Sequence, residues 1–145
     1  MGDDLINLYS GRILALAAAI PHQGRLAAPQ GTARRRSPLC GSSLTADVVL
    51  DQGRIAQFAQ EVRACALGQA SAAIAGAALP GRSRAEVQAA RDQLAAMLGD
   101  GAAPPLPPFD GYQVLIPARD YKNRHASILL VLDAVIEAMD AATPA

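Results

Sequence analysis

The segment that decides the fold reads LTADVVLDQGRIAQFAQEV and covers residues 44–62. Over residues 44–50, apolar side chains alternate with a second set that is mostly polar, which is typical of a half-buried strand. The Asp-Gln-Gly of residues 51–53 then offers a tight reversal, with Gly53 where a positive φ is expected. Strand-like residues resume from Arg54 to about Val62. We therefore predict a β-hairpin.

The return strand of this hairpin is irregular, and a third strand precedes it. Ile55 and Phe58 lie three residues apart rather than two, so the alternation slips by one residue and predicts a β-bulge. We interpret residues 24–38, rich in Arg, Pro and Gly, as turns with one irregular strand around Thr32–Arg36. The arginines of residues 34–36 are typical of a solvated edge strand, and zero net charge disfavours the alternative of a phosphate or RNA patch.

Helical patterns lie on both sides of the hairpin. Apolar residues recur every three or four positions in residues 5–20, and the Pro and Gly of residues 21–24 end that helix. Residues 65–79 are almost all Ala, Gly, Ser or single aliphatics, typical of a buried helix that lets neighbouring backbones approach closely. Residues 83–86 read Ser-Arg-Ala-Glu, a capping box that opens a further helix, and we expect Gly99 to close it.

The last third of the chain completes the predicted architecture. Residues 100–111 hold four prolines and two glycines, which predicts a loop. We expect a short extended stretch at Tyr112–Ile116 and a long C-terminal helix from about Asn123. The predicted fold class is α+β, with a small antiparallel three-stranded sheet packed against helices in one domain over residues 1–145.

Composition narrows the functional class. A chain of 145 residues that is 51% hydrophobic can bury a core, which excludes disorder throughout. Thirteen basic residues balance thirteen acidic ones, so no general attraction to nucleic acid arises. No apolar run approaches the roughly 18 residues of a membrane helix, and two cysteines are too few for a disulfide framework. We therefore expect a cytoplasmic protein with neither nucleic acid nor membrane as partner.

The two cysteines are the candidates for metal or sulfur chemistry. Cys40 lies in a turn directly before the first hairpin strand, and Gly41 frees the backbone there. Cys65 lies at the predicted N-terminus of the small-residue helix, where unpaired amides and the helix dipole favour a thiolate. Because the hairpin brings its ends together, we expect both thiols to face a common site. The alternative is that they are merely small buried hydrophobic residues.

Four motifs in order connect these cysteines to a known family. They are Ser-Pro-Leu-Cys-Gly at residues 37–41, the hairpin, Arg-Ala-Cys-Ala followed by Gln-Ala-Ser-Ala within residues 63–72, and His-Ala-Ser-Ile-Leu at residues 125–129. In these motifs the sequence resembles the iron–sulfur cluster scaffold family, which comprises IscU, zinc-binding SufU and the N-terminal domain of NifU. The resemblance covers most of the chain.

The resemblance implies ligand positions at Cys40, Cys65 and His125, with two departures from the family pattern. The family's Asp two residues after the first Cys is Ser42 here, and its third Cys is Ala126 here. Two thiolates and one imidazole still make a three-ligand site for Zn²⁺ or an iron–sulfur cluster. Water, a second subunit or a partner would supply the remaining ligands, so the site is expected to be open.

Other residues are weaker candidates for the same site. Ser42 and Asp120 are conceivable oxygen ligands. We expect His22, the only other imidazole, to be a surface or backbone-bonding residue in a turn. A lone histidine in the first turn of an apolar helix, as His125 is, is also commonly a packed or capping residue. Its assignment as a ligand therefore depends on the resemblance.

The function that the resemblance implies is that of a scaffold or carrier in iron–sulfur cluster assembly, and not of an enzyme. One site per chain, or one shared by two subunits, would bind the metal or nascent cluster. A cysteine desulfurase would donate sulfur, apo-proteins would accept clusters, and the chain would be a monomer or transient homodimer. Two alternatives stay open: a zinc-dependent protein that accepts persulfide sulfur, and a degenerate protein-binding module, which Ser42 and Ala126 favour.

Overall fold

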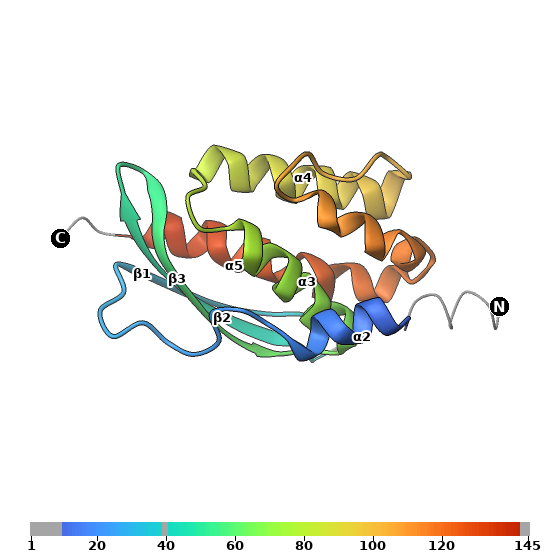
Figure 1. The fold of residues 1–145 in the computed structure, drawn as a ribbon, viewed down its shortest axis with the longest axis horizontal. Coiled ribbons are helices and arrows are strands. Elements are labelled where there is room, and N and C mark those ends of the chain that lie inside the picture. The colour runs from blue at the N-terminus through green and yellow to red at the C-terminus, as the bar shows by residue number, and fades with distance from the viewer. Residues whose placement is uncertain (1–9, 39–40, 143–145) are drawn as a thin grey trace.

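The computed structural model describes residues 10–38 and 41–142, which form a three-stranded antiparallel sheet covered on one face by helices (Figure 1). The strands are β1 Gly31–Arg36, β2 Ser43–Asp51 and β3 Arg54–Arg63, in the order β1-β2-β3. The helices are α2 Gly11–Ala18, α3 Ala66–Ala78, α4 Arg84–Asp100 and α5 His125–Ala141. This arrangement confirms the predicted α+β class and the three-stranded sheet.

The helices form two levels above the sheet (Figure 1). Helix α5 packs against β1 and β2, and α3 lies beside α5 and contacts α2. Helix α4 packs on α5 on the side away from the sheet. The core between these levels is made mostly of Leu, Ile, Val and Ala side chains that are under a tenth exposed. Within the described residues, every helix falls short of the length and hydrophobicity that a bilayer crossing requires.

The hairpin has the turn and the bulge that its sequence predicts. Gln52 and Gly53 both have positive φ, 52° and 76°, which is the conformation of a tight hairpin turn. Leu50 pairs with Ile55, and Val49 pairs with Gln57. The register therefore skips one residue of β3 between these pairs, and this bulge turns Ile55 and Phe58 to the same core.

Small residues in α3 allow close helix packing, as predicted. A Cβ on Gly76 would lie 2.8 Å from Cγ of Pro21, which follows α2. A Cβ on Gly68 would lie 2.6 Å from Oγ of Ser127 in α5. Real Cβ atoms do not approach other atoms so closely, so glycine is required at both contacts.

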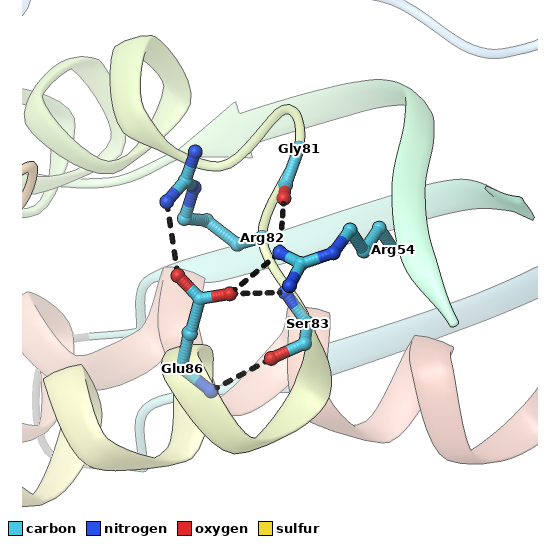
Figure 2. Close-up of polar contacts among 5 residues, drawn as sticks. All are labelled: Arg54, Gly81, Arg82, Ser83 and Glu86. Carbon is cyan, nitrogen blue, oxygen red and sulfur yellow. Dashed lines mark hydrogen bonds and ion pairs between the residues drawn. The ribbon is translucent and has the colours of Figure 1, made fainter. Parts of the chain in front are cut away.

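The N-terminus of α4 is fixed by a polar network that also holds the hairpin tip (Figure 2). Ser83 and Glu86 form the predicted capping box, in which the Glu86 amide donates to Ser83 Oγ at 3.3 Å. Arg54, the first residue after the hairpin turn, donates to Glu86 at 2.8 Å and to the Gly81 carbonyl at 3.0 Å, and Arg82 donates to Glu86 at 2.9 Å. The backbone hydrogen bond from Ser83 and the Arg54 guanidinium lower the pKa of Glu86 to about 2.

The end of α4 differs from the sequence prediction. We predicted that Gly99 closes the helix, but α4 continues to Asp100 and Gly101 is the C-cap with a φ of 73°. Glycine inside a helix costs only about 1 kcal/mol relative to alanine, so Gly99 does not force an end. The left-handed conformation that terminates α4 belongs to Gly101 instead.

The predicted extended stretch at Tyr112–Ile116 is also wrong. This segment lies inside a 3₁₀ helix, η1 Asp110–Asp120, followed by a short 3₁₀ turn, η2 Lys122–Arg124, before α5 begins at His125. Tyr112, Leu115 and Ala118 are the buried residues of η1, and their spacing of three is the period of a 3₁₀ helix rather than of a strand.

Buried hydrogen bonds join η1 to α3 and α3 to α5. The Tyr112 hydroxyl lies 2.8 Å from Ser71 Oγ in α3 and donates to the Ser71 carbonyl at 3.1 Å. Ser71 Oγ in turn donates to the Ile128 carbonyl in α5. Because Tyr112 is fully buried, its pKa is raised far above the ordinary value for a phenol. This chain of hydrogen bonds couples α3, α5 and η1.

Of the predicted helix over residues 5–20, the structure describes the part that forms α2. Ile13 is its buried residue, and α2 packs on α3. Residues 5–9 lie outside the described part of the chain. After α2, Gly24 has a φ of 121°, which agrees with the predicted end of the helix before this position.

Candidate functional site

The candidate site lies at the end of the sheet opposite the hairpin turn. Ser43, the first residue of β2, pairs with Arg63, the last residue of β3, and Cys65 follows directly as the N-cap residue of α3. The Ser37 amide donates to the Ser42 carbonyl at 2.7 Å, and the Gly41 amide donates to the Ser37 carbonyl at 3.0 Å. The residues on either side of Cys40 thus form a closed turn at the same sheet end as Cys65.

Cys40 itself lies outside the described residues. The prediction that its sulfur faces that of Cys65 therefore stays a prediction. Gly41, which we expected to free the backbone beside it, has a φ of 67°, in the left-handed region that glycine adopts readily. Because Ser43 pairs with Arg63, the turn that precedes β2 lies at the same end of the sheet as Cys65.

Cys65 carries a free thiol that is half-buried at the N-terminus of α3. Burial raises the pKa of this thiol. The nearby backbone N–H groups of Gly68 and Leu67, the Ser127 hydroxyl and the positive charge of Arg124 act in the opposite direction and outweigh it. The net pKa is lowered, although the side chain makes no capping hydrogen bond. The lowered pKa favours the thiolate form of Cys65, which metal binding and nucleophilic attack both use.

Two buried serines, Ser127 and Ser42, form a hydrogen-bonded chain with the Cys65 thiol. Cys65 Sγ lies 3.6 Å from Ser127 Oγ, and Ser127 Oγ donates to Ser42 Oγ at 3.0 Å. Ser127 is 1% exposed and Ser42 is 2% exposed. The three side chains come from α3, α5 and the turn before β2, so this network joins all the elements that surround the site.

Sequence reasoning missed the role of Ser127. Its only signal was its place in the His-Ala-Ser-Ile-Leu motif, one residue after Ala126. Ser42, which we considered as an oxygen ligand, accepts a hydrogen bond from Ser127. Because a hydroxyl can both donate and accept, the Ser127 proton can turn toward the sulfur when the thiol ionises. The two serines therefore suit a thiol that alternates between its protonated and ionised forms.

His125 begins α5, within the helix turn that also carries Ser127. Its Nε2 lies 3.0 Å from the carbonyl oxygens of both Ala118 and Arg119 at the end of η1. Carbonyl oxygens only accept hydrogen bonds, so Nε2 carries the proton and Nδ1 keeps its lone pair in the neutral ring. Histidines that bind metals commonly donate their other N–H to a backbone carbonyl in this way. The donor chemistry of His125 therefore fits a ligand that would bind through Nδ1.

The remaining candidates lie apart from this arrangement. Residues 10–38 and 41–142 contain no group of three or more His, Cys, Asp or Glu that could hold a metal ion, so Asp120 does not form one with Cys65 and His125. His22 packs its ring edge-on against Phe58, with a centroid distance of 5.9 Å, and its carbonyl accepts from the Gln60 amide. His22 is thus the backbone-bonding residue that we expected.

Comparison with solved structures identifies the family. The N-terminal domain of a nitrogen-fixing NifU-like protein from Brucella abortus superposes with a TM-score of 0.92 and 38% sequence identity, over 95% of this chain and 96% of that one. The chain belongs to the IscU/SufU/NifU N-terminal family. Comparisons with family models and with curated proteins give no match.

Two more distant structures share the fold of this NifU N-terminal domain. One is a putative iron–sulfur cluster assembly scaffold protein for the SUF system from Fervidobacterium islandicum, with a TM-score of 0.81 and 19% identity over 92% of this chain and 98% of that one. The other, described as a hypothetical protein, has a TM-score of 0.79 and 23% identity over 93% and 98%. At these identities the likeness establishes the NifU-like fold alone.

Proposed function

We propose that this chain is a scaffold or carrier for iron–sulfur cluster assembly that binds a metal or nascent cluster through Cys40, Cys65 and His125. The observation that carries the proposal is the Cys65 thiol. It is half-buried, its pKa is lowered, and it lies against the first turn of α5, where His125 offers Nδ1 as a donor atom. Thiolate sulfur and neutral imidazole are donors that both zinc and iron–sulfur clusters accept.

The cluster is a cargo in this proposal, so an incomplete set of protein ligands is a functional feature. Three protein donors leave a coordination position for water, a partner or a second copy of the chain. As in the family at large, the sulfur would come from a cysteine desulfurase and the acceptors would be apo-proteins. We place this activity in the cytoplasm, in one domain spanning residues 1–145 that acts as a monomer or a transient homodimer and not as an enzyme.

The test is anaerobic reconstitution with iron and sulfide, followed by metal and sulfide analysis of the wild type and three variants. We expect a brown protein that loses nearly all bound iron in Cys40→Ala and Cys65→Ala and only part of it in His125→Ala, because thiolates supply both charge and soft donor atoms. Ser37→Ala is the matched control, since it alters the same turn without removing a donor. Equal iron retention in all variants would overturn the proposed ligand set.

Ala126 gives a second test of the same site. It is exposed in the first turn of α5, next to His125 and Ser127. Ala126→Cys adds a thiol where the helix N-terminus favours a thiolate, so bound zinc or cluster should resist a chelator for longer. The melting temperature should also rise when metal is added, because binding to the folded state stabilises it. An unchanged chelation rate would place residue 126 away from the Cys65 site.

A second candidate function is supported by the same lowered thiol pKa. In a zinc-dependent sulfur-transfer protein, the Cys65 thiolate would attack the outer sulfur of a desulfurase persulfide. A new S–S bond would form on Cys65, the donor's S–S bond would break, and the donor cysteine would leave as a thiolate. Tight zinc with stimulated desulfurase turnover, and no brown protein on reconstitution, would favour this reading. If neither a brown protein nor tight zinc with desulfurase stimulation is obtained, the protein-binding module is favoured.

A further inference from the structure

The open face of the sheet holds a polar basin that the proposed cluster site does not use. The basin has a volume of about 410 Å³. Its floor carries the hydroxyls of Ser43 and Thr45, and its walls carry Arg25, Arg34 and Arg63. These residues belong to the face of the sheet away from α3 and α5, because Leu44 and Ala46, which alternate with them, point into the core.

The arginines of the basin differ in how their charges are compensated. Arg25 donates to both carboxylate oxygens of Asp47, at 2.6 and 3.1 Å, and lies 3.9 Å from Glu61. Asp47 is fully buried and also accepts from Thr32. The hydrogen bond with Asp47 raises the pKa of Arg25 and so keeps its guanidinium charged and fixed in place. Arg25 therefore neutralises Asp47, and Glu61 at the rim leaves the basin with one net positive charge from Arg34 and Arg63.

Arg34 and Arg63 have no such compensation. Neither forms an ion pair with any other described residue, whereas the arginines at positions 25, 35, 54, 82, 84 and 91 all pair with carboxylates. Arg34 pairs in register with Thr45 of β2, and Arg63 pairs with Ser43 of β2. The two uncompensated cations thus stand on opposite sides of β2, over the two floor hydroxyls.

The sheet geometry brings the two guanidinium groups within reach of one ligand. Strands lie about 4.8 Å apart and residues rise about 3.3 Å, so the backbones at Arg34 and Arg63 are about 12 Å apart across β2. Arginine side chains that extend inward from both sides can span that gap and meet over the hydroxyls of Ser43 and Thr45. Guanidinium groups and hydroxyls are the donors that phosphate and carboxylate oxygens select.

We propose that this basin, lined by Arg34, Arg63, Ser43 and Thr45, binds a small oxyanion of the phosphate or carboxylate class. The guanidinium groups of Arg34 and Arg63 favour an anion, and the floor hydroxyls can donate hydrogen bonds to its oxygens. The volume accommodates a molecule of pyrophosphate or citrate size. The site does not depend on the proposed function, because none of its residues is a proposed ligand of the cluster.

The test is isothermal titration of the metal-free full chain with pyrophosphate and, separately, with citrate at low ionic strength. We expect saturable binding of at least one of them that weakens as salt is added. Arg34→Gln and Arg63→Gln should each weaken it at least about tenfold, since each removes a charged hydrogen-bond donor. Glu61→Gln should strengthen it. Preference for pyrophosphate or for citrate would define a phosphoryl or a carboxylate ligand.

The matched control is Arg12→Gln. Arg12 is an exposed arginine of α2 that forms no ion pair among the described residues, and it lies outside the basin. Its loss changes the net charge of the protein by the same amount and should leave the affinity unchanged. Absence of saturable binding, or an equal loss of affinity in Arg12→Gln, would overturn the proposal. The circular dichroism spectrum of each variant verifies that the sheet is intact.

Discussion

At one end of the sheet the hairpin turn packs against the start of α4, and at the other end the two strands lead to Ser42 and Cys65. At the first end the charged groups are paired with one another, because Glu86 accepts hydrogen bonds from Arg54, Arg82 and the Ser83 backbone. The second end has a half-buried thiol whose described side-chain partner is the hydroxyl of Ser127. The hairpin end is therefore organised for stability, and the cysteine end keeps a reactive group available.

Substitutions at the two ends should change stability and thiol chemistry differently. The largest loss of stability is expected from Gly31→Ala, which lies toward the hairpin end. A Cβ at this position would lie 2.0 Å from the Ala138 carbonyl oxygen and 2.9 Å from the Ala142 amide, both backbone atoms of the α5 end that cannot move away. We expect a loss of about 3 kcal/mol in the free energy of unfolding, measured by urea denaturation. Gly99→Ala, which meets open space in α4, is the control and should be neutral or stabilising. Wild-type stability in Gly31→Ala would contradict this packing.

The next effect belongs to the cysteine end. Gly68→Ala would place a Cβ 2.6 Å from Ser127 Oγ and 2.8 Å from Ala64 Cβ, at a cost of about 1–2 kcal/mol. It should also displace Ser127 and so raise the pKa of the Cys65 thiol. Gly76→Ala is a matched control, because its Cβ would be equally crowded at 2.8 Å from Pro21 but far from the thiol. An equal change of the Cys65 thiol pKa in both variants would contradict the role assigned to Ser127.

Glu86→Gln tests the charged end. Glutamine can keep the capping box but not the ion pairs, which are partly exposed and screened, so we expect a loss of about 1 kcal/mol at neutral pH. The folded-state pKa of Glu86 is lowered to about 2. Its contribution is therefore complete above the ordinary pKa of a glutamate and is lost as the pH falls toward 2. The melting temperatures of the wild type and Glu86→Gln should converge as the pH is lowered. A constant difference in melting temperature down to pH 2 would contradict the ion pairs of Glu86.

Ser127→Ala should have the smallest effect on stability, below about 1 kcal/mol, because it removes one buried hydroxyl and its bond to Ser42. The pKa of the Cys65 thiol should rise, since the Ser127 hydroxyl lowers it. The measurement is the pH profile of alkylation at Cys65, resolved by peptide mass spectrometry. Ser37→Ala serves as the control, because Ser37 Oγ is buried without a hydrogen-bond partner among the described residues. An unchanged profile in Ser127→Ala would remove Ser127 from the site.

Local patterns explain which parts of the fold could be predicted. The hairpin, its bulge and the capping box follow from patterns of residues that are close in the chain, and all three are confirmed. The errors at Gly99 and Tyr112–Ile116 arose where several local structures suited the same residues and tertiary packing decided between them. The buried Tyr112, for example, bonds with Ser71, which lies 41 residues away in the chain.

The candidate site could be predicted only in part, for the same reason. Cysteine and histidine are recognisable as metal donors by residue type alone, so Cys65 and His125 could be named as candidate ligands from the sequence. Serines do not, and Ser127 approaches Cys65 and Ser42 across separations of 62 and 85 residues. The Arg25–Asp47 pair of the basin is likewise not evident from the sequence, because Asp47 fits the exposed polar positions of an alternating strand and nothing connects it to Arg25, 22 residues away.

The hydrogen bonds of Tyr112 bear on how a cargo could be exchanged. Ser71 of α3 donates to the Ile128 carbonyl of α5 and also bonds with the Tyr112 hydroxyl, so buried hydrogen bonds join the helix that begins after Cys65 to the helix that begins with His125. If the chain holds a cluster as proposed, the exposed methyl group of Ala126 marks the solvent side of the site, and the cluster would enter and leave past it without these helices separating.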